Sequence, residues 1–353
     1  MKKFAWILLT LALVLSACGT PAPVVPAATE PPTEAAAPEV TEEAPAATEA
    51  PAAEPFRVAV VMPSAKNDQA FGQSMYDALV AVQNEMGADK FEFSLSEGMF
   101  VVDDAAAAIR DYATQGFDLV IAHGSQYGSS LQEIAPDFPE TSFAWGTTLD
   151  TFGQPNIFAY EASSQEGGYV NGVLAATLTK SKVIGVVGPI ETGDAKLYVD
   201  GFKAGVAATD AAIQVNVNYI GSFSDVALAS EAATTHISAG ADVLTGSAQM
   251  VVGAIGKAEE ANALWFGTQS NQASLAPSIV VASQVYHWEV MLKEMIGLIQ
   301  AGTLGGQSFT ANLENGGQVI EFNSEYALPD DAKALAESTI KGIVDGSITI
   351  TLP

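Results

Sequence analysis

From residue 56 onward, short apolar runs alternate with longer stretches in which apolar residues recur at helical spacing. Runs typical of strands occur at 56–62, 91–95, 118–124, 183–188, 213–219 and 242–245. Helical spacing occurs at 70–86, 103–115, 166–179, 197–208, 225–239 and 251–262. This alternation predicts an α/β fold with doubly wound parallel sheets.

The strand–helix pattern forms two blocks, one before and one after residue 165. Because single cores seldom grow beyond about 250–300 residues, we expect two lobes. Their expected bounds are 56–162 plus about 287–304, and 163–286 plus about 305–353, with hinge crossings near 162, 286 and 304. Polar residues follow the strands at their carboxyl ends, where open α/β sheets bind ligands, so we expect a clamshell that closes on a solute.

The N-terminal residues have the pattern of a secretory signal. Lys2 and Lys3 precede an apolar run over 4–17, which is shorter than the roughly 20 residues of a membrane span. The run ends in LSAC at 15–18, which resembles the lipobox of bacterial lipoproteins. Cys18 is the only cysteine, so we predict that it is the first mature residue and carries the lipid anchor. An ordinary signal peptide with a chance cysteine is the alternative.

Residues 19–55 are dominated by Ala, Pro, Thr, Val and Glu and contain no Lys or Arg. Such a composition buries too little apolar surface to offset chain entropy. Proline and like charges favour an extended chain. We therefore expect a disordered tether between the anchor and an extracytoplasmic folded part.

The charge balance excludes several classes of function. The chain has 14 Lys+Arg against 41 Asp+Glu, a net charge of −27, which argues against nucleic-acid binding. One cysteine and three histidines leave no disulfide framework and few metal ligands. No nucleotide-binding, zinc-protease or nucleophile-elbow motif occurs; in GSQYG at 124–128, His123 stands where the elbow has glycine. We expect no catalysis, no cofactor and no metal, and a monomer.

Several short motifs follow one another in a characteristic order. They are DQAFGQ (68–73), AHGSQY (122–127), QEGGYVNG (165–172), GFKAG (201–205), YIGSFSD (219–225), GADV (240–243) and AP (276–277). Together they resemble the basic membrane protein family of bacterial solute-binding lipoproteins. The resemblance implies a type I periplasmic-binding-protein fold, an ABC permease as partner, and a purine nucleoside or nucleobase as solute. A sensor lipoprotein of the same fold, or a non-purine solute, is the alternative.

The first two motifs supply candidate ligand contacts from the first lobe. Phe71 lies just past a strand end, where its ring can stack on a planar ligand or belong to the core. Asp68 can accept from a ligand or cap the following helix. Ser125, Gln126 and Tyr127 follow a buried strand and are expected at the edge of the sheet.

The second lobe contributes Tyr169 and Phe223 as aromatic candidates, and the resemblance makes Phe223 the partner opposite Phe71. Two departures from the family pattern bear on the ligand. GTQSNQ at 267–272 stands where nucleoside-binding members have GVDxDQ, and VYHW at 285–288 lacks their lysine. The acidic and the basic side chain that would bind the ribose hydroxyls are thus absent. This predicts a neutral site for a free nucleobase.

VYHW is similar to a run in another branch of the family, some of whose members bind a nucleobase. Gln269, Asn271, Tyr286 and Trp288 are then expected to supply hydrogen bonds and stacking. Trp288 packing at the hinge is the alternative.

Overall fold

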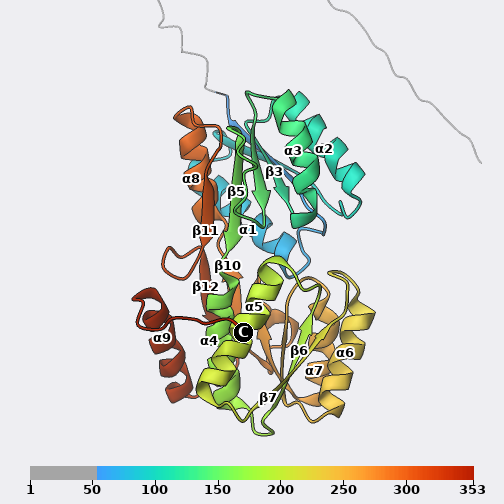
Figure 1. The fold of residues 1–353 in the computed structure, drawn as a ribbon, viewed down its shortest axis with the longest axis vertical. Coiled ribbons are helices and arrows are strands. Elements are labelled where there is room, and N and C mark those ends of the chain that lie inside the picture. The colour runs from blue at the N-terminus through green and yellow to red at the C-terminus, as the bar shows by residue number, and fades with distance from the viewer. Residues whose placement is uncertain (1–53) are drawn as a thin grey trace, which may run out of the picture. The chain divides into compact units, whose positions relative to one another are not determined.

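The computed structural model describes residues 54–353. The predicted signal peptide, Cys18 and nearly all of the tether lie outside the described residues. Within the described part the chain forms two six-stranded sheets, each covered by helices (Figure 1).

The first sheet has the strand order β11-β5-β4-β3-β1-β2, and every pair in it is parallel. Its strands are β1 (Phe56–Val61), β2 (Phe91–Ser96), β3 (Leu119–His123), β4 (Ser142–Gly146), β5 (Ile157–Ala162) and β11 (Ser308–Ala311). The helices of this lobe are α1 (Phe71–Met86), α2 (Val102–Thr114), α3 (Gly128–Ile134) and α8 (Glu289–Gln300). The central strand β3 is buried along its whole length, as its unbroken apolar pattern predicts.

The second sheet has the order β12-β10-β9-β8-β6-β7. Its strands are β6 (Val183–Gly188), β7 (Gln214–Tyr219), β8 (Val243–Gly246), β9 (Leu264–Gly267), β10 (Val280–Tyr286) and β12 (Gln318–Phe322). Its helices are α4 (Ser164–Leu178), α5 (Gly193–Thr209), α6 (Val226–Ser238), α7 (Val251–Ala261) and α9 (Asp330–Val344). In contrast to the all-parallel expectation, β12 pairs antiparallel with β10. The chain enters β12 from the first lobe, so this strand runs away from that lobe. The parallel strands of the second sheet run toward the first lobe, and β12 is therefore antiparallel to them.

The third crossing between the lobes differs from the expectation and is corrected. We expected it near residue 304, but β11 pairs with β5 in the first sheet, with Ser308 opposite Ala159. The chain therefore crosses between Ala311 and Gln318, and residues 305–311 belong to the first lobe. Pairing with β11 satisfies the backbone groups along the outer side of β5, which would otherwise be an open edge.

Two of the sequence motifs serve to pack α4 against α5. A side chain at Gly172 would lie 2.2 Å from the carbonyl oxygen of Phe202, and one at Gly205 would lie 2.1 Å from that of Tyr169. The glycines at 168, 172, 201 and 205 thus let the two helix backbones touch. The motifs QEGGYVNG and GFKAG consequently have a packing role in this fold.

None of the helices in residues 54–353 combines the length and the apolar character that a membrane crossing requires. In the same residues, no group of three or more His, Cys, Asp or Glu side chains is placed to hold a metal ion.

Candidate functional site

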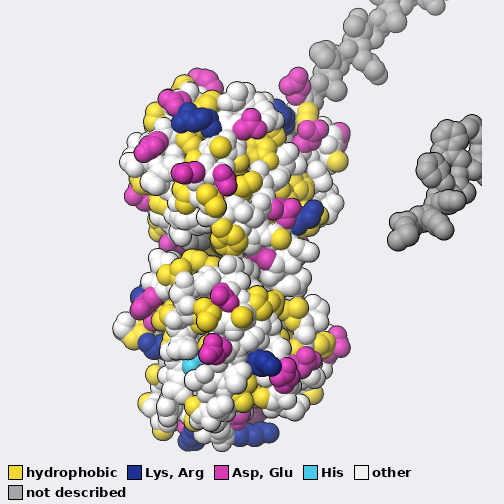
Figure 2. Space-filling model, turned by 90° about the vertical axis from the view of Figure 1, so that its right-hand side faces the viewer, with side chains coloured by type: hydrophobic (Ala, Val, Ile, Leu, Met, Phe, Trp, Pro, Cys, Tyr) yellow, Lys and Arg dark blue, Asp and Glu magenta, His cyan; other side chains and the backbone are white. Residues whose placement is uncertain are grey.

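A cavity of about 250 Å³ lies between the two lobes, at the carboxyl ends of strands from both sheets. Figure 2 shows the lobes as two rounded bodies that meet at a narrower waist. The first lobe lines the cavity with Pro63, Phe71, Phe100, Gly124, Ser125, Gln126 and Thr147. The second lobe lines it with Thr192, Gly193, Asp194, Ala195, Phe223, Ala248, Gln249 and Gln269.

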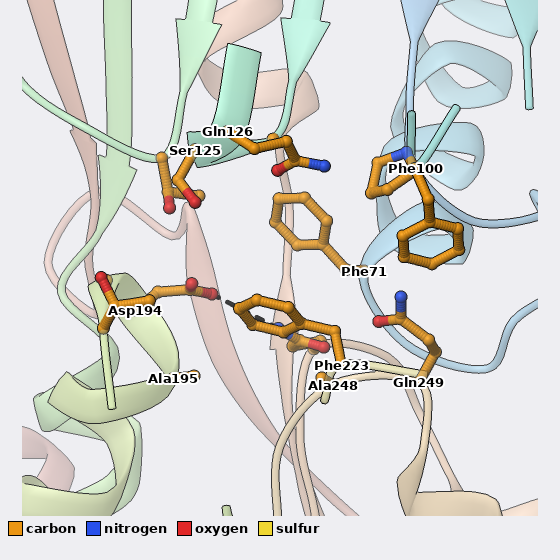
Figure 3. Close-up of a pocket in the computed structure, with 15 residues that line it drawn as sticks. Phe71, Phe100, Ser125, Gln126, Asp194, Ala195, Phe223, Ala248 and Gln249 are labelled. Carbon is orange, nitrogen blue, oxygen red and sulfur yellow. Dashed lines mark hydrogen bonds between the residues drawn. The ribbon is translucent and has the colours of Figure 1, made fainter. Parts of the chain in front are cut away.

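The cavity brings together part of the predicted site. The predicted residues in its lining are Phe71, Ser125, Gln126, Phe223 and Gln269. Phe71 and Phe223 come from different lobes and lie on opposite sides of the cavity (Figure 3). That these side chains contact a ligand stays a prediction.

Phe71 is held by a stack of aromatic rings behind it. Its ring lies parallel to the ring of His123, with centroids 3.8 Å apart and planes 5° apart. The ring of Trp288 lies nearly perpendicular to that of Phe71, with centroids 6.3 Å apart. Phe71 is only 9% exposed, so it is both a core residue and a wall of the cavity. Packing on several sides fixes the orientation of the ring before any ligand arrives.

His123 is a buried, neutral support for Phe71. Its Nε2 is 3.2 Å from the carbonyl oxygen of Phe71, and its Nδ1 is 2.6 Å from the hydroxyl of Tyr160. Because a carbonyl only accepts, Nε2 carries the proton and Nδ1 accepts from Tyr160. Burial lowers the pKa of His123 to about 3, so the ring is uncharged at neutral pH. His123 therefore acts on the cavity only through Phe71.

Phe223 is held more loosely. It lies in the loop between β7 and α6, is half-buried, and belongs to none of the apolar clusters of the described residues. The loop is anchored through the backbone, because the amide of Met250 donates to the Phe223 carbonyl at 3.1 Å. The second ring of the cavity is thus positioned by a loop and not by a core.

Asp194 is a cavity residue that the sequence analysis missed. It lies in the first turn of α5 and is 8% exposed. Its Oδ2 accepts from the Tyr286 hydroxyl at 3.0 Å and from Gln269 Nε2 at 3.3 Å; Figure 3 marks the second bond. Burial raises the pKa of Asp194, against these hydrogen bonds. The cavity lining therefore contains an acid, where a neutral site was expected.

The family of the chain follows from a match over nearly all of its described residues. The family model described as ABC transporter substrate-binding protein PnrA-like matches residues 56–350. The chain belongs to this family. The resemblance drawn from the motifs is thereby confirmed, and the PnrA-like family and its fold are those of substrate-binding proteins.

Two curated relatives and one solved structure illustrate the range of the similarity. A purine-binding protein of Brucella abortus is 26% identical over 260 residues, covering 74% of this chain and 73% of the relative. An ABC transporter nucleoside-binding protein, BmpA of Lactococcus lactis, is 26% identical over 310 residues, covering 80% and 85%. The structure of an ABC transporter solute-binding protein from Conexibacter woesei has a TM-score of 0.71 at 22% identity, covering 84% and 99%. That structural likeness confirms the predicted two-lobe fold.

In this PnrA-like protein Asp68 caps α1 and does not line the cavity. Its carboxylate accepts from the backbone amides of Ala70, Gly72 and Gln73 at 2.8, 2.9 and 3.0 Å, and from the Ser64 hydroxyl. Satisfying free amides at a helix start is the capping alternative raised from the sequence.

Two further predicted residues lie beneath or beside the cavity. Tyr286 lies behind its wall, where its hydroxyl donates to Asp194 and accepts from Ser164 at 2.6 Å. Trp288 is in the first-lobe core, and its Nε1 donates to Ser74 at 3.0 Å. Both act by holding other residues, and neither lines the cavity. For Trp288 this corresponds to the hinge-packing alternative.

The remaining predicted contacts are placed away from the cavity. Tyr127 is buried, and its hydroxyl donates to the Met99 carbonyl at 2.7 Å. Tyr169 lies on α4 where α5 crosses it, in the lining of a separate surface groove. Asn271 is exposed and donates to Glu321 at 2.5 Å. An aromatic or amide residue in a shared motif therefore need not face the ligand.

The segment 269–272, in which ligand contacts were expected, also forms hydrogen bonds between the two lobes. Ser270 Oγ donates to the Ala70 carbonyl at 2.7 Å, and Gln272 Nε2 donates to the Gln69 carbonyl at 3.1 Å. These bonds run from the second lobe to the start of the first helix beside the cavity. Of this segment only Gln269 lines the cavity itself.

Proposed function

We propose that this PnrA-like protein binds a purine nucleobase between Phe71 and Phe223 and presents it to an ABC permease. The observation that carries the proposal is the pair of phenylalanine rings on opposite sides of one small cavity. Aromatic faces stack favourably on planar heterocycles, and a small number of placed polar groups fixes their orientation. The amides of Gln126, Gln249 and Gln269 supply such groups.

A free base is preferred to a nucleoside in this proposal. The cavity of about 250 Å³ is smaller than the roughly 300–1,000 Å³ of pockets for drug-sized ligands. The residues that line it include no Lys or Arg to pair with ribose hydroxyls. The purine-binding name of one relative supports a purine ligand, and the nucleoside-binding name of the other makes nucleosides the necessary comparison.

The proposal includes attachment to the outer side of the membrane through lipid on Cys18. It is supported by the apolar run before Cys18, by the absence of any other cysteine in the sequence, and by the tether-like composition that follows. The lobes are joined by the crossings at β5–α4, β10–α8 and β11–β12, which suit hinge closure around a solute.

Calorimetric titration with adenine, hypoxanthine and guanine, and with adenosine, inosine and guanosine, tests the ligand class. We expect micromolar dissociation constants, about −8 kcal/mol, for at least one base and weaker binding of its nucleoside. Tighter binding of the nucleosides would contradict the preference for a base. No heat with any of the six would contradict a purine ligand altogether.

Uptake of the labelled base separates an importer component from a sensor. A strain without the gene should lose uptake, and the wild-type gene should restore it. Cys18→Ala should fail to restore it if the lipid anchor is needed. Normal uptake in the deletion strain would contradict the transport role.

A further inference from the structure

The second-lobe wall of the cavity contains two neighbouring side chains with hydrogen-bond acceptors, Asp194 and Gln269. The two side-chain hydrogen bonds of Asp194 both end at Oδ2. Its Oδ1 accepts from no side chain of the described residues, and the backbone amides of Asp194 and Ala195 also act on the carboxylate. Asp194 is nearly buried and lines the cavity. A carboxylate that borders a cavity can also accept from a donor on a ligand.

Gln269 supplies an acceptor without a partner beside this carboxylate. The carboxylate of Asp194 accepts, so the Gln269 atom that faces it is the Nε2 donor. The Oε1 atom is buried and has no hydrogen-bond partner in residues 54–353, and Gln269 is only 3% exposed. The backbone φ of Gln269 is 69°, in the left-handed region that residues other than glycine rarely adopt. Such strain tends to occur at binding sites.

Among residues 54–353, no Lys or Arg is part of the cavity wall beside these acceptors. The lining contains aromatic, amide, hydroxyl and small residues, and Asp194 is its only charged one. A donor for the unpartnered Gln269 oxygen, and a further donor for the Asp194 carboxylate, can therefore come from a ligand. A ligand edge with an acceptor in this place would meet a carboxylate and an amide oxygen, and would be rejected.

We propose that the cavity selects planar ligands that present two adjacent N–H donors to Asp194 and Gln269, as N1 and the 2-amino group of guanine do. The purine identity of the ligand rests on the proposed function, whereas the donor requirement rests on the two side chains alone. Hypoxanthine, which lacks the 2-amino group, and adenine, which has an acceptor at N1, bind less tightly.

Two matched ligand pairs test the proposal on the purified wild-type protein. Guanine and hypoxanthine differ by the 2-amino donor. Benzamidine and benzamide differ in that a cationic amidinium presents N–H donors where the neutral amide has a carbonyl oxygen, on a ring that is not a purine. The first member of each pair should bind about 10- to 100-fold more tightly, the range of one hydrogen bond to a charged group.

The variant Asp194→Asn connects the preference to the carboxylate. It keeps the size of the side chain but replaces one acceptor by a donor, so both preferences should fall to about twofold or less. Asp137→Asn is the matched control, because it removes one negative charge from an exposed residue paired with Arg110. It should leave both preferences unchanged. The wild-type pairs test the proposal even if Asp194→Asn does not fold.

The outcomes separate this inference from the proposed function. Equal or reversed preference in the wild type, with bases still bound, overturns the donor requirement and leaves base binding in place. Binding of benzamidine but of no base, abolished in Asp194→Asn, supports the donor requirement and contradicts the purine ligand. Absence of binding by all four ligands overturns the donor requirement, and if adenine does not bind either, it overturns the binding of a purine base as well.

Discussion

The two walls of the cavity are built differently. On the first-lobe side, Phe71 stacks in line with His123 and Tyr160, and Trp288 packs edge-on against these rings. On the second-lobe side, Phe223 sits on a loop, and beside it Asp194 and Gln269 form a small polar network. One wall is an extension of a hydrophobic core, whereas the other is a set of loops and a helix start.

This difference separates the tasks of the two walls. A ring that belongs to a core is preorganised, so little conformational entropy is lost when a ligand stacks on it. It also makes ligand affinity and folding stability depend on the same side chain. The polar wall contributes little to the core, so its residues can change the ligand preference with less effect on folding. The predictions below test that separation.

The largest effect is expected for Phe71→Ala. Removing a buried Phe costs about 3–5 kcal/mol of unfolding free energy, and we expect the lower end because one side of the ring borders the cavity. Affinity for the base should fall by a further 1–3 kcal/mol or so, as for a binding hot spot. Urea unfolding and calorimetric titration measure the two effects. Unchanged affinity in a folded variant would remove Phe71 from the site.

Phe223→Ala should weaken binding by a similar amount, about 1–3 kcal/mol, without the loss of stability. Its ring is half-buried and lies outside the core clusters of the described residues, so the unfolding free energy should change by no more than about 0.5 kcal/mol. The same two measurements apply. A loss of stability as large as that of Phe71→Ala would show that the walls are alike.

Tyr160→Phe tests the support behind the first wall. It leaves the buried Nδ1 of His123 without its donor, which should cost about 1–3 kcal/mol of unfolding free energy. Tyr219→Phe is the matched control, because the Tyr219 hydroxyl forms no hydrogen bond within residues 54–353. If both variants unfold at the same urea concentration as the wild type, His123 does not depend on this bond.

The smallest effect is expected for His287, at the crossing from β10 to α8. Its Nδ1 is 2.9 Å from Glu289 and its Nε2 is 4.0 Å from Glu321, and these acids raise the pKa of His287 to about 9. A raised histidine pKa stabilises the fold fully below the unfolded value of about 6.5, and the gain is lost as pH rises through about 9.

Melting temperatures of the wild type and of His287→Gln should therefore differ at pH 6 and converge by pH 10. Because His287 is partly exposed, the difference should be small. A constant difference over this range would contradict the shifted pKa. Ligand preference should not change, since His287 does not line the cavity.

The fold could be predicted further than the site. Unbroken apolar runs such as 118–124 identify buried strands, because a strand covered on both faces tolerates few polar residues. The strand 308–311 was missed because its four residues, SFTA, are too few and too polar to form a pattern. Its position in the first sheet depends on pairing with β5, which is far away in the sequence, so the local sequence does not predict it.

Site residues were harder to predict, since one residue type serves several purposes. Asp68 fits both a ligand contact and a helix cap, and it is a cap. The glycine-rich motif around Tyr169 is explained by helix packing. Asp194 was missed because the segment between β6 and α5 belongs to no motif and the helix was expected to begin only at residue 197. An acid just past the carboxyl end of a parallel strand was the available signal.

A crystal structure of the protein with its most tightly bound base tests the central claim most directly. We predict that the base lies between the rings of Phe71 and Phe223, with an N–H edge within hydrogen-bond distance of Asp194. A base bound elsewhere, or bound in the cavity without contact to either ring, would contradict the account.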